Sequence, residues 1–248
     1  MNISTTKAAR DTSVLLQKIK SKGLGGACRA VADRAEEWIL EGYFEWRLGI
    51  ATTGRISRET LGYDRAECNH YGPSAYGNIQ RIIKALNVQR HKDVFIDFGS
   101  GKGRVLVMAA MHPFARIIGI ERSPDLNEIA KHNIERARRS LECHQIEVVT
   151  ADAAAYQLPD DATAVYFASP FSGEILDVVL DNVKASLIRA PRRLSVISHG
   201  YDPANPFETQ VRKCEWLYLR SEVRLQRSNC AWIYMNSRWN ERPATPAV

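Results

Sequence analysis

Short apolar runs alternate with longer stretches of helical periodicity between residues 92 and 200, and this alternation constrains the fold more than any other feature of the chain. Strands are predicted over residues 94–98, 116–120, 146–149, 163–168 and 194–198. Helices are predicted between them, over residues 103–111, 124–140 and 173–188. Strands that alternate with helices are typical of a parallel sheet with crossover helices. We therefore expect one main α/β domain.

The alternation stops after residue 200. Pro203 and Pro206 interrupt the chain, and two further strand candidates, residues 215–220 and 230–236, are joined by about nine mostly polar residues. A connection this short favours an antiparallel pair, because a parallel pair needs a crossover of a dozen or more residues. The prediction is a Rossmann-like sheet of seven strands, mostly parallel, with an antiparallel last strand. A plain dinucleotide-binding sheet would continue with crossover helices instead.

Residues 1–73 are predicted to form a helical N-terminal extension or lid. Apolar side chains recur at helical spacing over residues 12–19 and 27–48, and the glycines between residues 23 and 26 separate the two stretches. A polar, turn-rich segment follows over residues 52–73. The aromatic side chains of the second helix are assigned to the core rather than to an aromatic pocket; they are Trp38, Tyr43, Phe44 and Trp46.

The main domain is expected over residues 74–240, with a disordered tail over residues 241–248. It begins with a predicted helix from Ser74 to Leu86, ahead of the first strand. The composition, 45% hydrophobic and 25% charged, is that of an ordinary globular protein. No apolar run resembles a signal peptide or reaches the ~18 residues of a membrane span. We therefore expect a cytoplasmic protein without a membrane partner.

Charge and cysteine content narrow the function classes further. The five cysteines are scattered and form no Cys-x-x-Cys pair, so reduced thiols and no metal site are predicted. A net charge of +6 leaves nucleic acid open as a partner. The densest basic clusters, however, lie near the ends of predicted helices, where positive charge complements the helix dipole.

A glycine-rich turn follows the first predicted strand. Gly99, Gly101 and Gly103 allow the backbone to approach a ligand closely, and the helix that begins after them presents free N–H groups. The nicotinamide fingerprint requires its third glycine at the next position, where this chain has Arg104. The turn therefore disfavours a nicotinamide dinucleotide.

Acidic residues follow three successive predicted strands. Asp97 lies at the end of the first strand, Glu121 at the end of the second, and Asp152 just after the third. The carboxyl ends of parallel strands form the ligand crevice of such a sheet, so we expect the three carboxylates to meet there. Asp97 would repel a pyrophosphate, whereas it suits a ligand with a cationic amino group and a sulfonium centre. Glu121 is placed to accept hydrogen bonds from two ribose hydroxyls.

This arrangement resembles the first three cofactor motifs of the class I S-adenosylmethionine-dependent methyltransferases, over about residues 74–236. The resemblance implies S-adenosylmethionine as cofactor, with Asp97 and the glycine turn at its methionyl part, Glu121 at the ribose and Asp152 at the adenine amine. The full cofactor set that it implies is Asp97, Gly99, Ser100, Gly101, Gly103, Glu121, Arg122, Asp152, Ala153 and Ala168.

The methyl acceptor is less constrained. Residues 168–171 read Ala-Ser-Pro-Phe, whereas methyltransferases of base amines or glutamine carry Asn or Asp there, followed by two prolines and an aromatic. Ala168 cannot accept a hydrogen bond from an amine, which argues against base-amine methylation. Residues 71–74 read Tyr-Gly-Pro-Ser and resemble a segment that lies over the cofactor in small protein-lysine methyltransferases. We expect an oxygen or nitrogen nucleophile of a small molecule, a sugar or a protein side chain, lysine included.

Three residues are candidates for the acceptor side of the reaction. His199, at the end of the fifth predicted strand, is the candidate base, and a base is required only if the acceptor starts protonated. Tyr71 is a second candidate, and Phe171 is expected to wall the acceptor pocket. Two other interpretations remain: a non-catalytic scaffold or RNA-binding module with this fold, and, third, a nicotinamide oxidoreductase.

Overall fold

The computed structural model describes residues 25, 28–64, 66–200, 206–226 and 229–236. Its centre is a seven-stranded sheet in the order β3-β2-β1-β4-β5-β7-β6. The strands are β1 (Val94–Phe98), β2 (Arg116–Glu121), β3 (Ile146–Thr150), β4 (Ala164–Phe167), β5 (Ser195–Gly200), β6 (Leu217–Arg224) and β7 (Cys230–Asn236). Strands β1 to β5 are parallel, and β7 is antiparallel to both of its neighbours, β5 and β6. The predicted mostly parallel sheet with an antiparallel last strand is confirmed.

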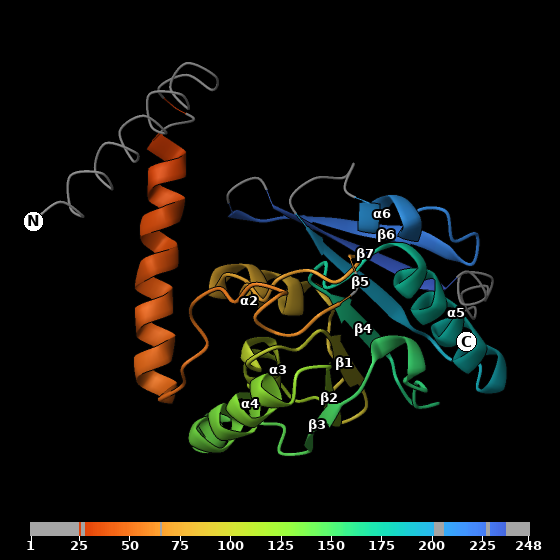
Figure 1. The fold of residues 1–248 in the computed structure, drawn as a ribbon, viewed down its shortest axis with the longest axis horizontal. Helices are drawn as coiled ribbons and strands as arrows, with labels where there is room; N and C mark the ends of the chain where they lie inside the picture. Colours follow the sequence, from red (N-terminus) through yellow and green to blue (C-terminus); the bar gives the residue numbers. More distant parts are fainter. Residues whose placement is uncertain (1–24, 26–27, 65, 201–205, 227–228, 237–248) are drawn as a thin grey trace, which may run out of the picture.

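Helices cover both faces of the sheet (Figure 1). They are α2 (Tyr76–Ala85), α3 (Arg104–Ala110), α4 (Pro124–Ala137), α5 (Gly173–Arg189) and α6 (Pro206–Val211), with short 3-10 turns at Arg138–Ser140 and Ala153–Ala155. Strand β1 is buried on both faces: Phe95 belongs to the apolar cluster formed with α2 and α3, and Ile96 to the cluster formed with α5. This double burial explains why β1 reads as a continuous apolar run rather than as an alternating one.

Local sequence signals explain where the helix after β2 begins. Ser123 caps α4, since its side chain accepts a hydrogen bond from the backbone N–H of Leu126, and Pro124 occupies the first turn. Proline is tolerated at this position because its missing N–H would have no partner inside the helix. The cap directly follows Glu121 and Arg122, so it fixes the chain at the point where the sheet meets the candidate site.

A long N-terminal helix over residues 28–48 stands beside α2 and α3 (Figure 1). Phe44 and Leu48 are buried against the main domain, but Trp38, Tyr43 and Trp46 are exposed. The assignment of all four aromatic side chains to the core is therefore wrong for three of them. Helical periodicity locates an apolar face but does not say whether anything packs on it.

Arg104 connects this N-terminal helix to the glycine turn. Its guanidinium is buried, donates to Glu41 Oε1 at 2.8 Å and to Thr52 Oγ1 at 2.6 Å, and lies 3.3 Å from Glu45 Oε1. The aromatic ring of Tyr76 stacks 4.2 Å from it. Since Arg104 is the first residue of α3, the N-terminal helix and the turn are held in one hydrogen-bonded network.

Two predictions fall outside the described residues: the helix over residues 12–19 and the tail over residues 241–248. Within the part of the chain that the structure describes, every helix is too short or too polar to span a bilayer.

Candidate active site

A pocket opens at the carboxyl ends of β1 and β2, beneath the segment formed by residues 61–74. Most of the residues predicted from the sequence line this pocket: Tyr71, Asp97, Gly99, Ser100, Glu121, Arg122, Asp152, Ala153, Ala168 and Phe171. Gly101, Gly103 and His199 are not among its lining residues. The parallel sheet thus brings together side chains that lie up to about a hundred residues apart in the chain.

The glycine turn requires glycine at all three positions, because φ is +79° at Gly99, +55° at Gly101 and +79° at Gly103. The turn is fastened to β2: the N–H of Gly99 donates to the carbonyl of Ile120 at 2.8 Å, and the N–H of Gly101 donates to Glu121 Oε2 at 3.0 Å. A side chain at Gly101 would fall on the ring of Tyr71. Gly101 and Gly103 therefore shape the site from behind rather than line it.

Asp97 is 2% exposed, and its Oδ2 is a buried atom without a hydrogen-bond partner among the described residues. Burial, and secondly the charge of Glu121, raise the pKa of Asp97 well above its usual value. The hydroxyl of Ser100, in the turn, is another buried polar atom without a partner in the described structure. Such atoms are costly unless a ligand satisfies them.

Glu121 is held by three donors. The N–H of Ser123 donates to Oε1 at 2.9 Å, the N–H of Gly101 donates to Oε2, and the hydroxyl of Tyr63 also donates to Oε1. Next to this contact, Asp64 forms an ion pair with Arg122 at 3.0 Å. Tyr63 was missed by sequence reasoning, because it lies in a turn-rich segment whose pattern carries no signal of what it contacts.

Asp152 serves partly as a structural cap. Its Oδ1 accepts a hydrogen bond from the N–H of Ala154 at 2.9 Å and so begins the 3-10 turn Ala153–Ala155. Both Asp152 and Ala153 still line the pocket. Capping and ligand binding are compatible here, since a carboxylate has a second oxygen to offer.

The chain is similar in sequence and in structure to known methyltransferases. A family model described as histone methylation protein DOT1 matches residues 57–159. An S-adenosylmethionine-dependent methyltransferase from Aquifex aeolicus is 13% identical, with 65% of this chain and 90% of that chain covered and a TM-score of 0.50. An RNA methyltransferase from Salinibacter ruber, in complex with S-adenosyl-L-homocysteine, is 22% identical over 71% of this chain and 99% of that chain, with a TM-score of 0.47. Among curated proteins, none matches the chain significantly.

The family match spans the glycine turn and the three carboxylates, and the strand order extends the likeness to the whole sheet. The fold is that of the class I, Rossmann-like S-adenosylmethionine-dependent methyltransferases. In this fold the pocket lies at the carboxyl ends of β1 and β2, where an open α/β sheet binds its ligands. The predicted cofactor, S-adenosylmethionine, agrees with the family model that matches residues 57–159 and with the fold.

Another part of the pocket wall is formed by residues 168–171 and by residues 68–71. Phe171 is buried there and packs edge-on against Phe167. The side-chain amide of Asn69 donates to the carbonyl of Ser169 at 2.7 Å. Ser169 has a φ of +51°, a rare conformation for a residue other than glycine. The two walls are therefore tied together at the pocket mouth.

Tyr71 lies across the glycine turn and is not poised as a base. Its hydroxyl donates to the carbonyl of Thr52 at 2.6 Å, and burial raises its pKa above the ordinary value. Lys102 Nζ lies 5.1 Å from the centre of its ring. These contacts indicate a positioning role over the turn.

His199 does not reach the pocket. It is buried within β5, its Nδ1 is 2.6 Å from the hydroxyl of Tyr166, and burial lowers its pKa to about 4. The structure thus places the predicted base inside the sheet. His70, which no sequence pattern singled out, lines the pocket mouth and is exposed.

Proposed function

We propose that this chain binds S-adenosylmethionine in the pocket and transfers its methyl group to a nucleophilic nitrogen or oxygen of a protein side chain. The observation that carries the proposal is the meeting of Asp97, Glu121 and Asp152 beside the glycine turn in one pocket. The cofactor would supply an electrophilic methyl group on a sulfonium. What the protein supplies is position and charge.

Asp97 is the residue that best fits a cationic ligand. An ammonium group near Oδ2 would satisfy that unpartnered oxygen and favour the ionised carboxylate that burial disfavours. Ser100 would hydrogen-bond the same amino-acid part of the ligand. Glu121, which already accepts two hydrogen bonds at Oε1 and one at Oε2, would accept one more at Oε2 from a ribose hydroxyl. Asp152 with Ala153 would face the adenine.

A protein acceptor is supported by the match to the DOT1 family model, whose range includes Tyr71-Gly72-Pro73-Ser74. Asn69 and His70 are exposed and line the same pocket as Phe171, so we place the entry of one extended side chain beside them. For an amine acceptor, His70 is the exposed group at this entry that is able to take up a proton, whereas His199 is enclosed in the sheet.

Cofactor binding is tested by isothermal titration with S-adenosylmethionine and S-adenosylhomocysteine. We expect micromolar binding by the wild type and its loss in Gly101→Arg and Asp97→Ala. Asp161→Ala is the matched control, since this more exposed carboxylate pairs with Arg116 and does not line the pocket. If neither ligand binds the folded wild-type protein, the proposal fails.

The acceptor class is tested with a tritiated methyl donor and fractionated lysate. We expect label in protein, released by protease and resistant to ribonuclease. Label in RNA or in small molecules would contradict the protein acceptor while leaving the cofactor site intact. The rival scaffold or RNA-binding module predicts salt-dependent RNA binding without any transfer of label. Binding of NAD(H) would support the oxidoreductase interpretation.

A further inference from the structure

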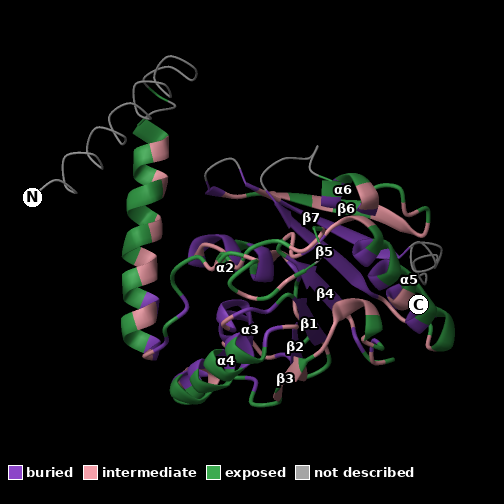
Figure 2. Cartoon of the chain, viewed as in Figure 1, coloured by how far each residue is buried: buried purple, intermediate pink, exposed green. Residues whose placement is uncertain are grey.

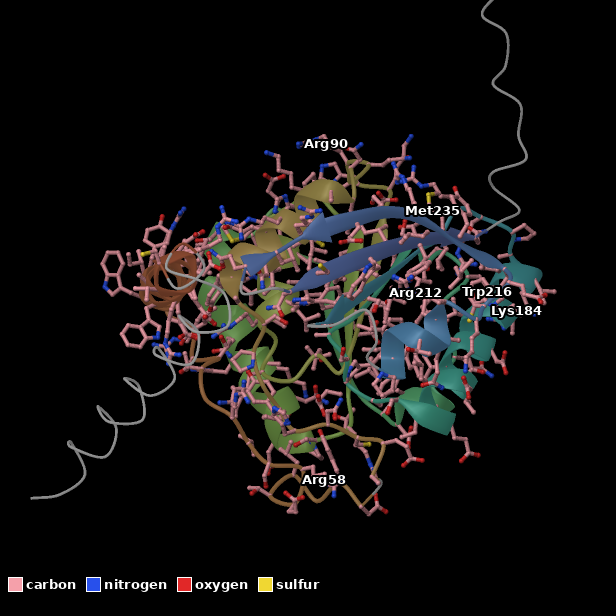
Figure 3. All side chains as sticks on the ribbon, turned by 90° about the horizontal axis from the view of Figure 1, so that it is seen from above. Arg58, Arg90, Lys184, Arg212, Trp216 and Met235 are labelled. Atoms are coloured by element: carbon pink, nitrogen blue, oxygen red, sulfur yellow. The ribbon has the colours of Figure 1, made fainter. Side chains whose placement is uncertain are left out.

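The N-terminal helix carries an apolar face that points away from the other residues that the structure describes. We call it the outer stripe; its members are Val31, Ala35, Trp38, Ile39, Gly42, Tyr43 and Trp46. The exposed fraction is 82% for Trp46, 70% for Ile39 and 67% for Trp38. At 3.6 residues per turn, these positions share a sector of roughly 140° that contains no charged side chain. In Figure 3, where the helix is seen nearly end-on, side chains project from it away from the domain.

The opposite face of the same helix is firmly attached. Phe44 and Leu48 are buried against the main domain, and Glu41 and Glu45 bind Arg104. Figure 2 shows the resulting division, with buried and half-buried positions turned towards the sheet and exposed positions outward. The helix therefore cannot rotate to bury the outer stripe on its own subunit without breaking this network.

Gly42 indicates that another polypeptide segment packs closely against the outer stripe. A glycine in a helix interior costs about 1 kcal/mol relative to alanine. Nothing lies within 4 Å of the position where a Cβ would stand at Gly42, so no contact within the described subunit requires a glycine there. Ala35 lies one heptad earlier on the same line of the helix and is also exposed. Small residues at this spacing allow the backbone of another helix to come near.

We propose that the outer stripe is a dimer interface, in which the helices of two copies of this chain pack antiparallel about a two-fold axis between Trp38 and Ile39. This register places Ala35 of one copy opposite Gly42 of the other, and Val31 opposite Trp46. The backbones then approach closely where the two small residues meet, and each tryptophan faces an aliphatic residue, Val31 or Ile39, whereas a parallel pair would set tryptophan against tryptophan. Such a contact uses the same patch on both copies, as a closed two-fold interface requires.

The apolar area of the outer stripe agrees with a second copy of the chain as its partner. Large aromatic side chains bury about 150–250 Å² each, so the stripe offers on the order of 600 Å² of apolar surface per subunit. This area is at the upper end of the exposed apolar patches found on monomers. It approaches the roughly 800 Å² that each partner buries in a stable interface. The charged residues that border the outer stripe are of both signs: Arg34 and Arg47 are positive, and Glu36 is negative. An anionic lipid surface would repel the negative one, so this border suits a second copy of the chain better.

Sedimentation velocity of the full chain tests the proposal. We expect a dimer at about 10 µM for the wild type, and a monomer for Trp46→Glu and Gly42→Leu. Gly42→Leu is the sharper variant, because it improves helix propensity and so should preserve or raise the melting temperature while blocking close approach. Ile188→Glu is the matched control on α5, where the side chain is 65% exposed, and it should remain dimeric.

A wild type that stays monomeric up to about 100 µM would overturn the proposal, and so would a Gly42→Leu variant that dimerises as tightly as the wild type. Deletion of residues 1–24 should leave the dimer intact. If that deletion instead converts a monomer into a dimer, the deleted segment is the occupant of the stripe and the proposal is wrong.

Disulfide crosslinking tests the antiparallel register. In a Cys28→Ser background, Ala35→Cys combined with Gly42→Cys should give a covalent dimer on oxidation. The two positions lie about 10 Å apart within one helix, too far for a bond inside one copy. Ala35→Cys alone should not crosslink; a covalent dimer of that single variant would show parallel helices and overturn the arrangement.

Discussion

The buried carboxylate of Asp97 destabilises the folded protein, and the same carboxylate is expected to bind a cationic ligand. Burial, and secondly the charge of Glu121, raise the pKa of the Asp97 carboxyl group. Its Oδ2 has no hydrogen-bond partner among the described residues. Between pH 3.8 and the raised pKa, the folded protein binds more protons at this residue than the unfolded chain does. The contribution of Asp97 to the free energy of unfolding therefore falls as pH rises through this range. Affinity for a cationic ligand must rise over the same range.

Asp97→Asn separates these two effects. We expect the empty variant to melt at a higher temperature than the empty wild type at neutral pH, with the difference shrinking as pH is lowered towards 4, because the amide carries no charge to bury. Binding of S-adenosylmethionine should weaken at least tenfold. Thermal unfolding with and without ligand across this pH range measures both quantities. A variant that is less stable at every pH would refute this account of Asp97.

Tyr63 is expected to hold the Glu121 carboxylate in place. Tyr63→Phe keeps the ring beside Arg122 but removes the hydroxyl that donates to Glu121. We expect affinity for S-adenosylmethionine to fall about three- to tenfold, which corresponds to the roughly 0.5–1.5 kcal/mol net contribution of a typical hydrogen bond. Calorimetric titration provides the measurement. Tyr218→Phe, on β6 away from the pocket, should bind as the wild type does, and equal effects of the two changes would argue against a specific role for Tyr63.

At the scale of elements, the N-terminal helix and α3 depend on one buried arginine. The Arg104 side chain is 5% exposed, and that of its partner Glu45 is 17% exposed. Glu45 also accepts from the backbone N–H and the hydroxyl of Thr52, at 2.9 Å and 2.5 Å. Removing only one member of such a network leaves an uncompensated charge with little access to water.

Arg104→Met should lower the free energy of unfolding by about 3 kcal/mol, because Glu41 and Glu45 would lose their cation. Adding Glu45→Gln should cost less in this variant than in the wild type, since the two residues are coupled. Urea denaturation of the four proteins of this cycle measures the coupling. Arg138→Met, which removes an exposed ion pair with Glu135, should change stability by less than about 0.5 kcal/mol. Additive effects of Arg104→Met and Glu45→Gln would disprove the network.

At the scale of the whole molecule, residues 28–48 are part of the structural support of the site and not a detachable cover. Deletion of residues 1–49 removes the buried side chains of Phe44 and Leu48 and both acidic partners of Arg104. We expect the melting temperature to fall by about 10 °C, with weaker cofactor binding. Differential scanning calorimetry checks this. Deletion of residues 1–24 alone keeps every contact described above and should shift melting by less than about 2 °C.

Most of the sheet could be predicted from local pattern. Strand β1 and strand β7 begin and end where the sequence predicts, because each apolar run is bounded by glycine, proline or polar residues. Glycine spacing and the position of Asp97 relative to Gly99 likewise predicted residues that line the pocket. These are properties of neighbouring residues, so a linear pattern records them.

The contacts of Tyr63, His70 and His199 could not be predicted in this way. Tyr63 and Glu121 meet only because the segment before β1 folds back over the sheet, and nothing in the polar run around Tyr63 indicates this. His199 was expected at an open strand end, but its side chain is buried, with Nδ1 2.6 Å from the hydroxyl of Tyr166 on the neighbouring strand β4. The exposure of Trp38 and Trp46 is likewise decided by which helix face meets α2 and α3.

By itself, the sequence determined the order of strands and helices between residues 74 and 200, the glycine turn and the three carboxylates that follow successive strands, because chain direction and periodicity place these features whatever the rest of the molecule does. It did not predict helix α6. Only the tertiary structure decided which residues complete the pocket, which histidine is enclosed, and which face of the N-terminal helix remains open to a partner. Those outcomes depend on contacts between segments distant in sequence, whose energies arise from burial and from paired charges that no local pattern records.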